Sequence, residues 1–212
     1  MKSLHLKQIN QKIDLNNEIK IIRVENVELY KELYFNLPNS ITISKNNSLI
    51  DFDKISTVLF SPLDLKINDK KMINYLYKKF ESRLDDEARL ILSDIELKSI
   101  KLLELLSYIT GLEITYEHNI DFSKLLASFN VKFDEPKYSN YTELFIRYCK
   151  LCREIFKIEI IFSFGITNIL TENEINEINY QLSQNDIDVI DFIFTTKSIN
   201  NSFIIDDDWC II

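Results

Sequence analysis

The sequence predicts an α/β protein whose sheet-containing head is interrupted by a helical insertion. Strand-like and helix-like segments alternate near both ends of the 212 residues, and long helical segments lie between them. Hydrophobic residues make up 46% of the chain, which is ample for a folded core. The chain has only two glycines, Gly111 and Gly165, so loops that need several glycines are absent from it.

Residues 1–60 are expected to form the first part of the head. Apolar runs ended by turn residues indicate strands, and apolar residues that recur on one side of a helix indicate a helix. The helix is Val27–Leu37, and we expect Pro38 to stop it. The strands are Lys20–Val24, Thr57–Phe60 and a hairpin of Ser40–Ile43 with Ser48–Phe52.

Residues 61–140 are expected to form a helical leg. Asn68–Leu84 is amphipathic, with apolar residues on one face and lysines on the other. The acids at 85–87 favour a helix start, and that second helix runs to Thr110 with Gly111 as its cap. Its last turns, Leu102–Leu106, are apolar nearly all round, so we expect them to be buried. The remaining leg elements are a short strand or edge segment at Leu112–Tyr116, a helix at Asp121–Ser128 and an extended piece at Val131–Phe133.

Residues 141–212 are expected to complete the head. Ile158–Phe164 is the strongest strand, because a near-continuous apolar run is typical of a strand buried on both faces. Thr171 and Glu174 have the spacing of a capping box and open a helix. The other elements are a helix at Tyr141–Phe156 and strands at Asp188–Phe194, Phe203–Ile205 and Trp209–Ile212.

The scarcity of glycine excludes several functional motifs. A P-loop needs two closely spaced glycines followed by a lysine, and neither Gly111 nor Gly165 lies in such a sequence. The dinucleotide fingerprint and the nucleophile elbow are excluded on the same ground. We therefore expect neither ATP binding nor ATP hydrolysis.

The net charge of −8 is concentrated near the C-terminus. Thr171–Ile212 holds nine of the 33 acids and one of the 25 bases. The preceding 170 residues therefore hold 24 acids and 24 bases. An acidic total argues against nucleic acid but leaves room for a local basic face.

The cysteine count and the hydropathy pattern predict a cytoplasmic protein. The three cysteines argue for a reducing compartment, because an odd count does not suit a disulfide framework. No apolar run approaches the roughly 18 residues of a membrane span. Met1–Asn16 has no continuous apolar stretch of the kind found in a signal peptide.

Five segments carry a family resemblance through their order and spacing. They are Ile21–Leu33 (IIRVENVELYKEL), Leu59–Phe80, Asp121–Phe133 (DFSKLLASFNVKF), Ile160–Glu174 and Asp207-Asp208-Trp209. In this arrangement the chain, from about Leu15 to its end, resembles the short form of the type II-A CRISPR adaptation protein. That family consists of ring-shaped proteins that bind the ends of double-stranded DNA.

The resemblance implies a fold and a function. The implied head is nucleotide-binding-like, a degenerate P-loop ATPase-like domain without a working phosphate loop, and the implied insertion is a helical leg. The family forms homotetrameric rings that are supported by calcium, takes part in spacer acquisition and has no known catalytic activity. Its implied partners are double-stranded DNA, further copies of the chain, other CRISPR adaptation proteins and the effector nuclease of the same system.

Lysines on the first leg helix are the candidate DNA-binding residues. A rigid helix that presents ammonium groups gives salt-sensitive affinity that does not depend on base sequence. A solvated helix face is the competing interpretation of the same lysines. The candidates are Lys70, Lys71, Lys78 and Lys79, with Lys132 added by the family resemblance alone.

Three carboxylates after the second leg helix are the candidate calcium ligands. Calcium takes six to eight oxygen ligands, which closely spaced carboxylates and loop carbonyls can supply. The candidates are Glu113, Glu117 and Asp121, in a segment that resembles the acidic, metal-bearing stretch of the family. Scattered surface acids are the competing interpretation.

Two other functional classes remain open at this stage. The first is a metal-dependent nuclease that uses the same three carboxylates. The second is a protein-interaction subunit whose docking surface is the acidic segment Thr171–Ile212. The pair Cys149-x-x-Cys152 lies on one face of a helix beside aromatic residues, so we expect buried packing rather than zinc binding or redox chemistry.

Overall fold

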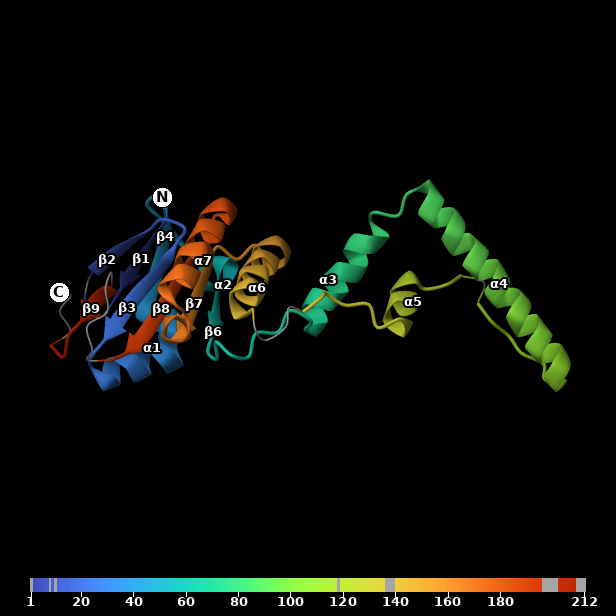
Figure 1. The fold of residues 1–212 in the computed structure, drawn as a ribbon, viewed down its shortest axis with the longest axis horizontal. Helices are drawn as coiled ribbons and strands as arrows, with labels where there is room; N and C mark the ends of the chain where they lie inside the picture. The colour runs from blue at the N-terminus through green and yellow to red at the C-terminus, as the bar shows by residue number, and fades with distance from the viewer. Residues whose placement is uncertain are drawn as a thin grey trace. The chain divides into compact units, whose positions relative to one another are not determined.

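The chain forms two compact units in a computed structural model that describes residues 2–7, 9, 11–117, 119–135, 140–195 and 202–208. The first unit, which we call the head, consists of Met1–Ile67 and Glu135–Ile212, and the second, the leg, is Asn68–Asp134. Figure 1 shows a sheet with helices in the head and helices alone in the leg. The leg expected from the sequence, residues 61–140, is wider at both ends than this unit.

A five-stranded parallel sheet forms the centre of the head and confirms a mixed α/β class. Its strands lie in the order β6-β7-β8-β3-β9, and each neighbouring pair is parallel. In β7 and β8 nearly every residue is buried, as expected for strands covered on both faces. The strands are β3 (Ile19–Val24), β6 (Ser56–Leu59), β7 (Ile160–Phe164), β8 (Asp188–Phe194) and β9 (Ser202–Ile205). The strand expected at Trp209–Ile212 lies outside the described residues.

A second, antiparallel sheet of four strands belongs to the same unit. Its order is β2-β1-β4-β5, with β1 paired to both β2 and β4. The hairpin of β4 (Ile41–Lys45) and β5 (Ser48–Ile50) confirms the sequence prediction, and a short helix, α2 (Phe52–Ile55), follows it. The pair β1 (Lys2–Leu6) and β2 (Gln11–Leu15) was not predicted.

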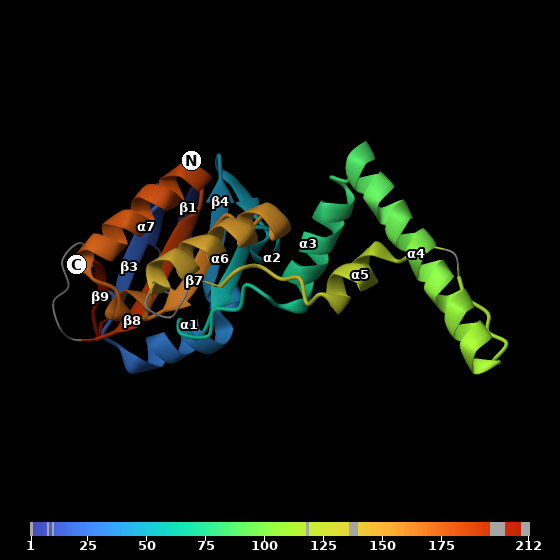
Figure 2. The same cartoon turned by 45° about the vertical axis from the view of Figure 1, so that its right-hand side comes forward.

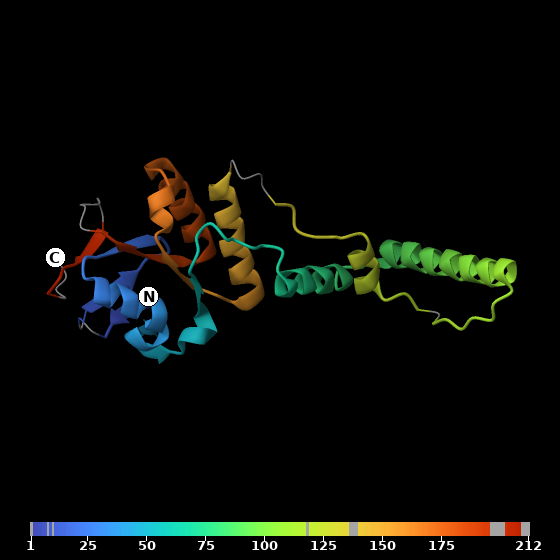
Figure 3. The ribbon, with the colours of Figure 1, turned by 90° about the horizontal axis from the view of Figure 1, so that it is seen from below.

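Helices cover both faces of the parallel sheet. Figure 3 shows α1 (Val27–Ser40) on one face, with α6 (Tyr141–Phe156) and α7 (Glu172–Asn185) on the other. A short 3-10 turn, η1 (Ile166–Ile169), connects β7 to α7. Leucines of α1, side chains of β1 and β4, and alternate residues of the parallel strands share one buried cluster between the two sheets. The predicted capping box of Thr171 and Glu174 is present at the start of α7.

Pro38 does not stop α1, which corrects the sequence prediction. The helix runs to Ser40, but Asn36 has non-helical dihedral angles of φ −135° and ψ 28°. The helix is interrupted at Asn36 and begins again just before Pro38. A proline is tolerated in a first helical turn because its missing N–H has no intrahelical acceptor there.

The described part of the leg contains three helices, which Figure 2 labels. They are α3 (Lys70–Glu81), α4 (Asp86–Thr110) and α5 (Phe122–Ser128). An aspartate caps each start: Asp69, Asp85 and Asp121 accept hydrogen bonds from backbone N–H groups of their own first turns. Gly111 ends α4 in the left-handed region at φ 67°, as predicted.

Two expectations for the leg are wrong within one chain. Leu102–Leu106 is not buried: α4 has no buried residue, and Leu102 and Leu105 are 56% and 53% exposed. Leu112–Tyr116 forms no strand, because it has no neighbouring strand in a helical unit. Val131–Phe133, which was expected only to be extended, lies in neither a helix nor a strand. No helix in the described ranges is long and apolar enough to cross a membrane.

Candidate nucleic-acid interface

The basic face of α3 is built by its amphipathic sequence. Met72, Leu76 and Tyr77 turn inward and are buried, because they recur on one side of the helix. The lysines fall on the remaining surface: Lys70, Lys71 and Lys78 are exposed and Lys79 is half-buried. Nζ of Lys79 lies 5.6 Å from the ring centroid of Tyr75, within the range of a cation–π contact.

The structure holds Lys132 beside α3, far from it in sequence. The side chain of Asn68 exchanges two hydrogen bonds with the backbone of Phe133, at 2.8 Å to its N–H and 3.0 Å to its carbonyl. The hydroxyl of Tyr77 donates to the carbonyl of Val131 at 3.0 Å. Lys132, exposed between these two anchored residues, therefore adds a cation next to the lysine helix.

This arrangement suits phosphate contacts rather than base recognition. Lysine ammonium groups are point charges on flexible stems, and they bind phosphate without a fixed geometry. Contacts of this kind position a protein on a duplex but carry no sequence information.

The three candidate calcium ligands do not converge within one chain. The segment after α4 runs back along that helix, where the hydroxyl of Tyr116 lies 3.4 Å from Oε1 of Glu104 and the N–H of Ile120 donates to Oε1 of Glu96 at 2.9 Å. Glu113 and Glu117 are exposed on this extended segment. Carboxylates four residues apart on an extended chain are separated by roughly 13 Å along it.

The donor set in one copy therefore does not fit calcium. Asp121 already accepts the N–H of Lys124 at 3.0 Å as the cap of α5. Within the described ranges no group of three or more histidine, cysteine, aspartate or glutamate side chains is placed to hold a metal ion. Calcium needs six to eight oxygens, and the calcium site stays a prediction.

Aromatic rings occupy the carboxyl ends of the parallel strands, where ligands bind in open α/β sheets. Phe60 follows β6, Phe164 ends β7 and Phe194 ends β8. Tyr34 of α1 packs against Phe60 and Phe164 at centroid distances of 5.2 and 4.8 Å. Tyr30 lies 5.6 Å from Phe194. These rings therefore pack against one another at that edge of the sheet.

The β3–α1 connection is too short to form a phosphate loop. Only Glu25 and Asn26 separate the strand from the helix. The side-chain oxygen of Asn26 accepts the N–H groups of Glu28 and Leu29 at 3.0 and 2.9 Å. In nucleotide-binding folds the N-terminus of this helix binds phosphate. Here the side chain of Asn26 caps it instead.

A buried carboxylate, Asp191, organises the turn after β7. Its Oδ1 accepts the hydroxyl of Ser163 at 2.7 Å and the N–H groups of Gly165 and Ile166 at 2.8 and 3.0 Å. Its Oδ2 accepts the N–H and hydroxyl of Thr167 at 2.9 and 2.5 Å. Sequence reasoning missed this residue, although an acid within the apolar strand sequence DVIDFIF was the available signal.

A second ionic cluster joins the two sheets of the head. Glu159 contacts Lys45 at 2.8 Å and Arg153 at 3.1 Å, and Lys2 lies 2.7 Å from Oδ2 of Asp188. Burial alone would raise the pKa of Glu159, but the hydrogen bonds from Lys45 and Arg153 hold that pKa below its ordinary value. Burial raises the pKa of Asp188 despite Lys2. The cluster is structural, because it ties β1 and β4 to the parallel sheet.

The two helix cysteines pack in the core, as predicted. Cys149 and Cys152 are free thiols and are 1% and 2% exposed. Burial raises the pKa of the Cys149 thiol well above its ordinary value, which suppresses the reactive thiolate.

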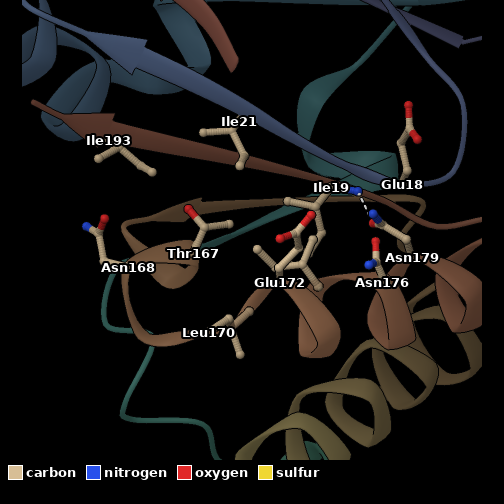
Figure 4. A pocket seen from close by; sticks show the side chains of 11 residues that line it. Glu18, Ile19, Ile21, Thr167, Asn168, Leu170, Glu172, Asn176, Asn179 and Ile193 are labelled. Atoms are coloured by element: carbon tan, nitrogen blue, oxygen red, sulfur yellow. Dashed lines mark hydrogen bonds between the residues drawn. The ribbon is translucent and has the colours of Figure 1, made fainter. Parts of the chain in front are cut away.

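A cavity of about 530 Å³ opens between α7 and the parallel sheet. Figure 4 shows Ile19, Ile21 and Ile193 on the strand side, with Glu172 and Asn176 facing them from α7. The eleven described residues that line it are five aliphatic residues, three asparagines, two glutamates and a threonine.

Comparisons with known proteins do not identify a family. No family model matches the sequence, and no curated protein matches it. Among solved structures, the chain is similar to a putative ABC transporter ATP-binding protein from Pyrococcus furiosus. The two share 9% identity over 95% of this chain and 94% of that one, with a TM-score of 0.37. Because a TM-score this low does not establish a shared fold, the α/β class rests on the sheet itself.

Proposed function

We propose that this chain is a non-enzymatic, ring-forming protein that binds the ends of double-stranded DNA during CRISPR spacer acquisition, a part of adaptive antiviral defence. The basic face of the leg carries the proposal. Lys70, Lys71 and Lys78 are exposed on one rigid helix, and Lys132 is anchored beside it. Several ammonium groups on one support give the salt-dependent affinity that end binding without sequence preference requires.

The local charge of α3 supports this proposal. An acidic protein holds DNA only where its bases are kept apart from its acids. The acidic segment Thr171–Ile212 belongs entirely to the head, whereas the lysine helix belongs to the leg. Within α3 itself, four lysines accompany a single acid, Glu81.

Self-association is supported by the apolar surface of α4. Leu102, Leu105, Tyr108 and Ile109 are 53% exposed or more in a single chain, and the described leg buries none of them. Exposed apolar surface of this extent marks a protein interface. We propose that further copies of the chain cover it in a homotetramer, as the family resemblance implies, with any calcium ligands shared between copies.

The head is proposed to be a nucleotide-binding-like, degenerate P-loop ATPase-like domain that binds no nucleotide. Its parallel sheet supports the first part of this proposal. The two-residue connection before α1, the cap formed by Asn26 and the aromatic rings at the strand ends support the second. The proposed protein partners, other CRISPR adaptation proteins and the effector nuclease, rest on the family resemblance alone.

The test compares linear duplex DNA with a covalently closed circle of the same sequence. A closed ring of protein threads onto free ends, so we expect binding to linear DNA and none to the circle. Lys71→Glu/Lys78→Glu is expected to lower affinity at least tenfold. The double variant should also reduce the slope of log affinity against log salt by roughly 2, since each lost phosphate contact removes about 0.9.

A matched control reverses two lysines of the head. Lys12 and Lys31 are each 56% exposed, so Lys12→Glu/Lys31→Glu changes the net charge by the same amount away from the leg. We expect this variant to retain at least half of the wild-type affinity. Equal loss in both variants, or tight binding to the closed circle, would contradict the interface. Cleavage of the DNA with magnesium or manganese would favour the nuclease alternative instead.

A further inference from the structure

The cavity between α7 and the sheet lies in the head and has no part in the proposed DNA interface. Its volume of about 530 Å³ falls within the range of small-ligand sites, which run from about 300 to 1,000 Å³. Its floor is apolar, because Ile19, Ile21 and Ile193 are all below 9% exposed and lie where the strands pass beneath α7. A ligand that enters it must therefore bring an aliphatic surface.

Three of the polar residues around that floor, Thr167, Glu18 and Glu172, offer hydrogen-bond acceptors. The hydroxyl proton of Thr167 is committed to Oδ2 of Asp191 at 2.5 Å, so the free lone pairs of that oxygen can only accept from a ligand. Glu18 and Glu172 add two carboxyl groups. An ionised carboxylate accepts hydrogen bonds but cannot donate one.

The charge of the lining is negative. None of the described residues that line the cavity is lysine, arginine or histidine. Lys20 contacts one oxygen of Glu18 at 2.5 Å, whereas Glu172 is exposed and has no ion pair among the described residues. Phosphate and carboxylate ligands are disfavoured here, since both would meet like charge without a compensating cation.

We propose that this cavity binds an alkyl cation, that is, a guanidinium or ammonium group carried on an aliphatic stem. The stem lies on the isoleucine floor, and the cationic head donates to Glu172 and to the hydroxyl oxygen of Thr167. Arginine and lysine bury their stems against apolar surface in this way while their charge stays at a polar rim. The ligand is an arginine or lysine side chain of a partner protein or a free polyamine, which share this chemistry.

The test follows the isoleucine δ1-methyl signals of the whole protein by nuclear magnetic resonance. n-Butylguanidinium is titrated in, with butyrate as the matched anion of similar stem. We expect saturable shifts at Ile19, Ile21 and Ile193 with the cation and none with butyrate. Spermidine and N-acetylarginine methylamide are then compared, and the probe that saturates at the lower concentration identifies the source as a polyamine or a protein side chain.

Two matched variants of α7 test the carboxylate. Glu172→Gln removes the unpaired charge at the cavity and is expected to weaken butylguanidinium binding roughly two- to fivefold, the range of an exposed ion pair. Glu177→Gln removes an exposed charge from the same helix outside the cavity and should leave the affinity unchanged. Absence of saturable shifts, equal shifts with butyrate, or equal weakening in both variants would overturn the proposal. The measurement uses no DNA, so its outcome is independent of the proposed DNA binding.

Discussion

Replacing Asp191 by asparagine is expected to lower the free energy of unfolding by about 2–4 kcal/mol. Asp191 is fully buried, and its two oxygens accept five hydrogen bonds from one strand and one turn. Asparagine has nearly the same shape, so the change acts on hydrogen bonding and charge rather than on packing. An amide presents one oxygen where the carboxylate presents two.

The magnitude follows from which donors lose their acceptor. If the amide oxygen takes the place of Oδ1, it keeps Ser163, Gly165 and Ile166, but its NH₂ group then faces the N–H of Thr167. A buried donor without an acceptor costs about 1–3 kcal/mol, and each retained bond loses about 1 kcal/mol of charge assistance. The lower desolvation cost of a neutral amide offsets part of this loss.

Urea unfolding followed by circular dichroism measures the change, with two milder variants as controls. Ser163→Ala and Thr167→Val each remove one hydroxyl donor and leave Asp191 its other partners, so each should cost about 1 kcal/mol. Hydrogen exchange gives a local measure: the amides of Gly165, Ile166 and Thr167 should exchange faster in Asp191→Asn. A loss below that of either control, with those amides still protected, would refute this account of the turn.

Three further outcomes are expected. Because the contacts with Lys45 and Arg153 hold the pKa of Glu159 below its ordinary 4.5, its stabilisation is present above pH 4.5 and lost as the pH falls below it. Glu159→Gln should therefore reduce the fall in the thermal unfolding midpoint between pH 4.5 and lower pH. An unchanged fall would contradict the role given to Glu159. Leu105→Asp should convert an oligomer to a smaller species by light scattering at micromolar concentration with calcium present, and a monomeric wild type under those conditions would count decisively against assembly. Calorimetry with ATP should show no binding, and micromolar affinity would overturn the interpretation of the β3–α1 connection.

The elements best predicted from sequence are those with strong local signals. Tyr141–Phe156 and Asp188–Phe194 have the predicted bounds. The first has a clear helical period, and in the second, β-branched and aromatic residues flank Asp191. The strands Lys2–Leu6 and Gln11–Leu15 were missed, since they are short and mix polar with apolar residues. Their apolar side chains are buried only through contact with the cluster between the sheets, which is a tertiary effect.

The candidate site shows the same division between local and long-range information. The helical period alone places Lys71 and Lys78 opposite the buried face of α3. The position of Lys132 depends on hydrogen bonds from Asn68 and Tyr77 to residues more than fifty positions away, which no local pattern encodes. Spacing likewise did not show that Glu113 and Glu117 follow an extended path that keeps them apart.

The exposed apolar surface of α4 makes the folding of the leg depend on the proposed assembly. This helix has 25 residues and no buried side chain, and isolated helices gain little stability from propensity alone. Most helical stability in proteins comes from packing of an apolar face, which α4 lacks in one chain. If further copies supply that packing, assembly and ordering of the leg are one equilibrium. The lysines of α3 would then form a continuous basic lining only in the assembled ring, so DNA binding would depend on protein concentration as well as on salt.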